Sequence, residues 1–87
     1  MHSLSCSVII VAYNSRDYIA ACVASVVDAL QNLDSEIIVL DNGSQVPVLD
    51  RQKAAFPKVR WLESRENLGF GKGCNLAARS AKKNVHF

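Results

Sequence analysis

The 87-residue sequence lacks a strong charge of either sign, because ten Lys and Arg residues stand against eight Asp and Glu, a formal net charge of +2. The basic residues are scattered along the chain, apart from the adjacent pair Lys82 and Lys83. Proteins that bind nucleic acids usually present a basic stripe with interleaved aromatic side chains. The sequence therefore predicts no nucleic-acid partner, whereas a phosphorylated small molecule remains compatible with it.

Cysteine, histidine and long apolar runs are also scarce. The three cysteines, Cys6, Cys22 and Cys74, are an odd number with no Cys-x-x-Cys pair, so we expect reduced thiols in a cytoplasmic protein. The two histidines, His2 and His86, stand near the two ends without metal-ligand spacing, which argues against a zinc site. No apolar run approaches the ~20 residues that span a bilayer, and the first residues lack the pattern of a signal peptide.

Hydrophobic residues are abundant, at 49% of the sequence. That share is enough for a hydrophobic core and argues against disorder. The length suits one small domain, which buries only about 60–65% of its unfolded surface. We therefore expect a single folded unit of marginal stability.

Strand and helix patterns alternate along the chain. The apolar, β-branched run "CSVIIVAYN" is typical of a strand buried on both faces of a parallel sheet. Further strands are predicted at 36–41 and 59–63, and helices at about 16–31, 48–56 and 73–83. The fold class predicted is α/β: a Rossmann-like, mostly parallel sheet of three strands plus the start of a fourth at Val85, with flanking helices. A fourth strand this short predicts that residues 1–87 are the N-terminal portion of a larger, truncated domain.

Polar and glycine residues follow each of the three predicted strands. In an open parallel sheet, ligands bind at the carboxyl ends of the strands. The segments that arrive there are Ala12-Tyr13-Asn14, Asp41 to Ser44, and Asn67 to Asn75. This clustering predicts a binding site at that edge, where Tyr13 either stacks on a base or packs within the protein.

Asp41 is the strongest single candidate, because a carboxylate that closes an apolar strand is costly unless hydrogen-bond donors meet it. It has two interpretations. In the first, Asp41 caps its own loop through the backbone amides of residues 42–44. In the second, it binds a ligand, such as the ring N–H of a pyrimidine base or a ribose hydroxyl. The two roles are compatible.

The stretch "ENLGFGKGCN" holds three glycines at alternate positions beside a lysine. Neither common nucleotide-binding glycine pattern fits, because Glu66 and Cys74 stand where glycines are required. The backbone N–H groups of Gly69 and Gly71 are not covered by side chains, and together with Lys72 they could bind an anion at the start of a helix. The alternative is that the glycines let that helix pack closely against the sheet.

Three segments in this order and spacing resemble the start of a family 2 glycosyltransferase with the GT-A fold: "SVIIVAYNSRDYIAACVASVV", "EIIVLDNGS" and "VRWLESRENLGFGKGCNLAARSA". The resemblance implies that Asp41 receives the base ring N–H. The sequence departs from the commonest family pattern at Gly73 and Cys74, which replace an Ala-Arg pair. The direct arginine contact of the family is therefore absent, and Lys72 is the candidate substitute. The nucleotide-binding residues carried over by position or predicted from the glycine stretch are Ala12, Tyr13, Asn14, Asp41, Asn67, Gly69, Gly71, Lys72 and Asn75.

The resemblance also implies an activity. Such an enzyme passes a sugar from a nucleotide-sugar donor, here a UDP- or dTDP-sugar, to a saccharide or lipid-linked acceptor in bacterial polysaccharide or cell-envelope synthesis. The glycine pattern is similar to that of rhamnosyltransferase-like members. A divalent metal, Mg or Mn, is expected, but its ligands and the catalytic base lie beyond Phe87 in the family. We therefore expect no catalytic or metal-binding residue here, an isolated chain that is inactive, self-association through an exposed sheet edge, and a cytoplasmic or membrane-peripheral full-length protein.

The sequence leaves two other classes of function as alternatives. A non-catalytic nucleotide- or partner-binding α/β module would need a stable, closed sheet within 87 residues. A phospho-receiver with Asp41 as acceptor would need an acidic pair after the first strand, where Tyr13 and Asn14 stand instead.

Overall fold

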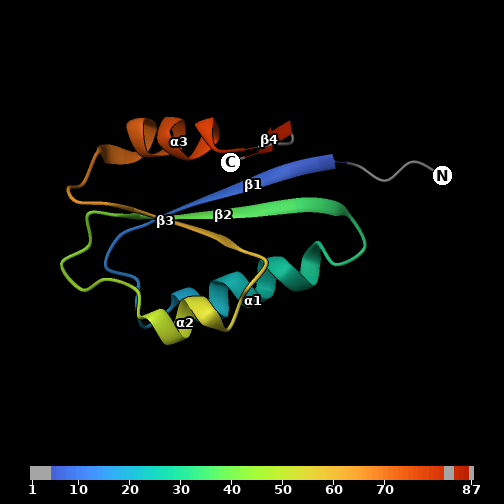
Figure 1. Cartoon of the computed structure of the whole chain (residues 1–87), viewed down its shortest axis with the longest axis horizontal. Helices are drawn as coiled ribbons and strands as arrows, with labels where there is room; N and C mark the ends of the chain where they lie inside the picture. The colour runs from blue at the N-terminus through green and yellow to red at the C-terminus, as the bar shows by residue number, and fades with distance from the viewer. Residues whose placement is uncertain (1–4, 82–83, 87) are drawn as a thin grey trace.

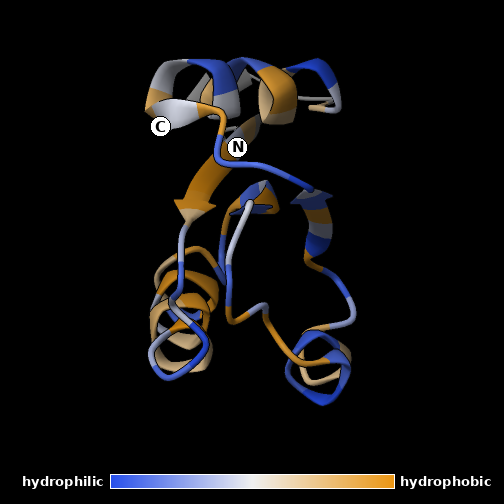
Figure 2. Cartoon of the chain, turned by 90° about the vertical axis from the view of Figure 1, so that its left-hand side faces the viewer, coloured by the Kyte–Doolittle hydropathy of each residue, from blue (hydrophilic) through white to orange (hydrophobic). Residues whose placement is uncertain are grey.

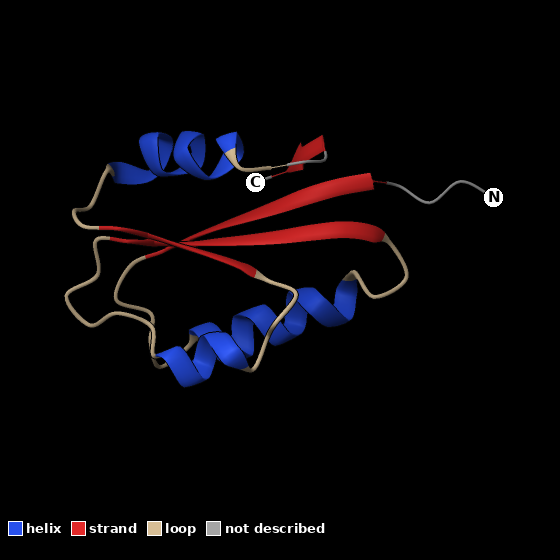
Figure 3. Cartoon of the chain, in the orientation of Figure 1, coloured by secondary structure: helices blue, strands red, loops and turns tan. Residues whose placement is uncertain are grey.

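The computed structural model describes residues 5–81 and 84–86, in which four strands alternate with three helices. Figure 1 and Figure 3 show a central sheet that lies between two layers of helices. The elements are β1 (Ser5–Ala12), α1 (Ile19–Ala29), β2 (Asp34–Asn42), α2 (Asp50–Ala54), β3 (Arg60–Ser64), α3 (Gly69–Arg79) and β4 (Asn84–His86).

The sheet has the strand order β3-β2-β1-β4, and all of its pairings are parallel. This confirms the predicted α/β class and the short fourth strand; Phe87, expected within that strand, lies outside the described residues. The register sets Ala12 beside Asp41, and Asp41 beside Glu63. The ends of three strands are therefore level with one another, at the left of Figure 1.

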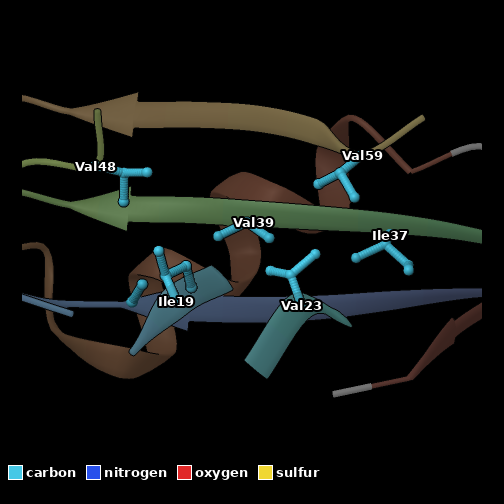
Figure 4. Close-up of a cluster of buried hydrophobic side chains, with 7 residues drawn as sticks. Ile19, Val23, Ile37, Val39, Val48 and Val59 are labelled. Atoms are coloured by element: carbon cyan, nitrogen blue, oxygen red, sulfur yellow. The ribbon is translucent and has the colours of Figure 1, made fainter. Parts of the chain in front are cut away.

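One face of the sheet packs on α1 and α2. Its core combines β2 side chains with residues from α1 and from the two segments that flank α2, as Figure 4 shows. Val23 and Val39 are completely buried, and each such side chain contributes about 1.5–3 kcal/mol relative to an exposed one. The buried members of this cluster are Ala12, Ile19, Val23, Ile37, Val39, Val48 and Val59.

The other face packs on α3. Ile38 and Leu40 alternate with Ile37 and Val39 along β2, so they point to the opposite side and meet Ala77 of α3. Figure 2 looks onto the carboxyl end of the strands, with α3 above the sheet and the other helices below it. Because both faces are covered, β2 is apolar without interruption from Ile37 to Leu40, as the sequence predicted.

Two helix starts differ from the predictions. The first helix begins at Ile19 rather than at about Arg16, because residues 13–18 form a loop in which Asn14 adopts a left-handed conformation with φ of 49°. The third helix begins at Gly69, about one turn before the predicted position. The backbone N–H of Gly69 donates to the Asn67 side-chain oxygen at 2.7 Å, which stabilises the helix start despite the glycines that follow.

Candidate functional site

A hollow of about 190 Å³ lies where β2 and β3 end. The loop that follows β2 closes one side of it, and the residue that follows β3 forms its rim. The lining residues are Asp41, Ser44, Pro47, Glu63, Ser64 and Arg65. The strand ends therefore form a depression with one buried carboxylate and one exposed guanidinium, and binding of a ligand there stays a prediction.

Asp41 is only 2% exposed, and both of its carboxylate oxygens accept hydrogen bonds within the protein. Oδ1 accepts from the Ser44 hydroxyl, and Oδ2 accepts from the Val48 backbone N–H at 2.9 Å. The structural role foreseen for Asp41 is thus real, although its partners are not the amides of residues 42–44. Each carboxylate oxygen has a second lone pair, so these bonds leave acceptor capacity for a ligand.

Asn14 joins the loop after β1 to the loop after β2. Its side-chain oxygen accepts from the backbone N–H groups of Gln45 and Val46, at 2.8 and 3.2 Å. Its own backbone N–H donates to the Ser44 hydroxyl oxygen at 2.9 Å. Asn14 therefore holds Ser44 against Asp41, which gives it a positioning role, while its predicted contact with a nucleotide stays a prediction.

The neighbouring residues of the first loop differ in exposure. Ala12 is buried in the core on the α1 side, so its side chain has a packing role in this structure. Tyr13 is 47% exposed at the strand end, which leaves much of its ring accessible. The stacking interpretation of Tyr13 is compatible with that exposure and remains untested.

Asn42 and Gly43 are structural parts of this edge that the sequence analysis did not single out. Asn42 is 2% exposed, and its side-chain amide accepts from Leu68 N–H and donates to the Gly69 carbonyl oxygen. Gly43 has a φ of 68°, and a Cβ there would overlap the backbone of residues 66 and 67. The signal in the sequence was a second polar residue closing the same buried strand, followed by glycine.

The three alternate glycines have three different surroundings. Gly69 has a φ of 77°, a conformation that glycine adopts without cost. A Cβ on Gly73 would lie 3.2–3.3 Å from side-chain atoms of β1 and β2, so this glycine allows α3 to pack closely on the sheet. Gly71 faces open space. The close-packing interpretation therefore holds for Gly73, and the glycines form the first turns of a helix rather than a loop.

Lys72 and Asn75 lie away from Asp41. Both are exposed on α3 and line a separate hollow of about 300 Å³ along that helix, together with Leu68, Leu76 and Arg79. Asn67 is also exposed, and its side-chain oxygen accepts a hydrogen bond from the Asn42 side-chain amide at 3.3 Å. The structure thus brings Asn14 and Asp41 together but does not bring Lys72 or Asn75 to them.

The described residues, 5–81 and 84–86, contain no group of three or more His, Cys, Asp and Glu side chains that could hold a metal ion. Glu63, which lines the same hollow as Asp41, forms an ion pair with Lys53 at 3.0 Å. Glu66, outside that lining, is exposed. The described helices include none that is long and apolar enough to cross a membrane.

Comparison with known proteins gives a consistent result. The sequence model described as glycosyl transferase family 2 matches residues 7–86. The chain is similar to YfnE, an uncharacterized glycosyltransferase of Bacillus subtilis (strain 168), with 33% identity over 85 residues, or 94% of the chain. It is also similar to chondroitin synthase of Escherichia coli, with 36% identity over 76 residues, or 84% of the chain. These matches span 21% and 11% of the two relatives.

Proposed function

This chain belongs to glycosyl transferase family 2, and we propose that it is the nucleoside-binding portion of an enzyme that transfers a sugar from a UDP- or dTDP-sugar donor. The observation that supports this proposal most is the hollow at the strand ends, with Asp41 buried in its wall. A carboxylate fixed by two internal hydrogen bonds is a preorganised acceptor, which loses little freedom when a ligand N–H binds.

The base of the donor is the part that this hollow suits. Uracil and thymine each carry a ring N–H between two carbonyl oxygens, so an acceptor flanked by donors complements that edge. Asp41 supplies the acceptor, and Tyr13 lies in the neighbouring loop where an exposed ring can stack on a base. The non-catalytic binding module remains the second candidate, because binding of the base alone would serve either function.

The acceptor in this proposal is a saccharide or a lipid-linked saccharide. One relative carries the name chondroitin synthase, which supports a saccharide product for the present chain as well. A rhamnosyl donor and a cytoplasmic site at the membrane surface, where lipid-linked acceptors are reached, are the finer parts of the proposal. They rest on the sequence resemblance alone.

A divalent metal, Mg or Mn, would neutralise the leaving diphosphate in such a reaction. The described residues do not offer a fitting ligand set, because they contain no group of three or more Asp, Glu, His and Cys side chains that could hold a metal ion. No step is therefore assigned to a metal on this chain. In this proposal the residues of the chain itself bind and orient the base.

A titration of the 15N-labelled chain with UDP, and separately with dTDP, tests this proposal. We expect the amide signals of residues 12–14, 41–48 and 63–65 to shift, because these segments surround the hollow. Inorganic pyrophosphate is the control for simple charge attraction and should leave those signals unchanged. Shifts confined to the outer face of α3, or the same shifts with pyrophosphate, would contradict the proposal.

A further inference from the structure

The cation that shares a hollow with Asp41 is Arg65, not Lys72. Arg65 follows β3 directly and lines the same hollow as Asp41, whereas Lys72 lines the hollow on α3. The sequence resemblance left the place of a missing arginine open, with Lys72 as its candidate substitute. The geometry of the sheet decides between the two residues.

Side chains alternate between the two faces of a strand, and this alternation separates the two cations. Trp61 packs on the core beneath α1 and α2, and Glu63 forms an ion pair with Lys53 of α2. The odd-numbered side chains of β3 therefore face those helices. Arg65 is the first residue after the strand, and it lines the hollow together with Glu63 and Asp41. Asp41 lies two residues after Val39 on β2, so its side chain faces the same side of the sheet as Val39.

Lys72 belongs to the opposite layer. It lies on α3, the helix that covers the other face of the sheet through Ala77. Lys72 is moreover exposed, on the side of α3 that carries Asn75 and Arg79 rather than the side that carries the buried Gly73 and Cys74. Lys72 and Asp41 therefore lie in different layers of the fold and line different hollows.

The serine hydroxyl groups around the hollow already donate hydrogen bonds within the protein. The Ser44 hydroxyl donates to Asp41, and the Ser64 hydroxyl donates to the Glu66 carbonyl oxygen at 2.6 Å. Glu63, also in the lining, offers only acceptors and is paired with Lys53. Within residues 5–81 and 84–86, the Arg65 guanidinium makes no hydrogen bond or ion pair, so its fork of N–H groups is available.

We propose that Arg65 is a specificity-determining residue that donates a hydrogen bond to the C4 carbonyl oxygen of the uracil or thymine base whose ring N–H binds Asp41. This assignment rests on the proposed function and names the donor that the base edge requires beside Asp41. Cytosine lacks the ring N–H and carries an amino donor in place of one carbonyl, so the Asp41 and Arg65 pair selects against it. A site that hydrogen-bonds a substrate group discriminates strongly against an analogue that lacks the group.

The test measures the Kd of uridine, cytidine and UDP by NMR for the wild-type chain and for Arg65→Gln, with Arg79→Gln as the matched control on the outer face of α3. We expect Arg65→Gln to weaken uridine and UDP by the same factor, roughly tenfold, as for loss of one hydrogen bond from a charged donor. The preference for uridine over cytidine should fall with it. Arg65→Lys keeps the charge but not the fork, and should recover only part of the affinity.

The remaining outcomes test the role of Arg65 and the proposed function separately. A loss seen with UDP but not with uridine would mean that Arg65 contacts the diphosphate and would overturn the assignment. Equal effects of Arg65→Gln and Arg79→Gln, or a larger effect of Lys72→Gln, would also overturn it while the proposed function stands. Absence of uridine and UDP binding by a folded wild-type chain would instead remove the proposed function together with this inference.

Discussion

Replacing Asp41 by asparagine separates its structural role from its role in binding. The side chain keeps its shape but has one acceptor oxygen in place of two. Because the Val48 backbone N–H is a donor only, the amide oxygen of the variant must face it, and the amide NH2 group must face Ser44. The Ser44 hydroxyl oxygen can accept, so both groups keep a partner. We expect the free energy of unfolding to fall by only about 1 kcal/mol, the net value of one hydrogen bond.

Base binding should suffer more than folding. The amide group would turn a donor toward the ring N–H, or share an oxygen that Val48 already uses. Leaving one buried group unsatisfied in this way costs about 1–3 kcal/mol, which weakens binding by roughly 5- to 150-fold. Chemical denaturation gives the first quantity, and NMR titration with uridine gives the second.

Two controls sharpen this comparison. Glu63→Gln alters an exposed carboxylate in the same hollow and should change stability by no more than about 1 kcal/mol, as usual for a surface ion pair. Asp41→Ala leaves the Val48 N–H without its partner and should destabilise the fold by about 1–3 kcal/mol more than asparagine does. Unchanged uridine affinity in Asp41→Asn, with a clear loss of stability, would refute the binding role and leave Asp41 as a loop cap.

Four further predictions follow from the same structure. Gly43→Ala should destabilise the fold by about 2–4 kcal/mol, whereas Gly71→Ala, in open space on a helix, should stabilise it by about 0.5–1 kcal/mol; thermal melts would show opposite shifts. Asn42→Ala should cost about 1–3 kcal/mol, and hydrogen exchange should report faster opening at Leu68; unchanged exchange there would count against the bridge. Light scattering should detect self-association through an unpaired sheet edge, and a compact, cooperatively melting monomer would argue against it. The chain alone should release no UDP from UDP-sugars with Mg or Mn; metal-dependent release abolished by Asp41→Ala would make Asp41 catalytic.

The fold was predictable because each strand carries its own local signal. An uninterrupted apolar strand such as 37–40 requires cover on both faces, and this alone implies a parallel sheet between helix layers. The polar end of β2 likewise indicated internal hydrogen bonds to Asp41, although the partners are the Ser44 hydroxyl and the Val48 N–H rather than the amides of residues 42–44. These features depend on neighbouring residues in sequence, which a single sequence displays.

What escaped prediction depends on contacts between distant segments. The start of α3 at Gly69 is stabilised by the buried side chain of Asn42, 27 residues away, against the low helix propensity of glycine. The separation of Lys72 from Asp41 depends on which face α3 covers, and no local pattern reveals that. The partnership of Asn14 with residues 44–46 similarly joins two loops across 30 to 32 positions.

Intermolecular NOEs between the base protons of bound uridine and the chain test the central claim most directly, because they locate the base itself. The account predicts contacts from the base to Tyr13 and to residues around the hollow that Asp41 and Arg65 line. Contacts instead to the outer face of α3, around Lys72 and Asn75, would contradict it.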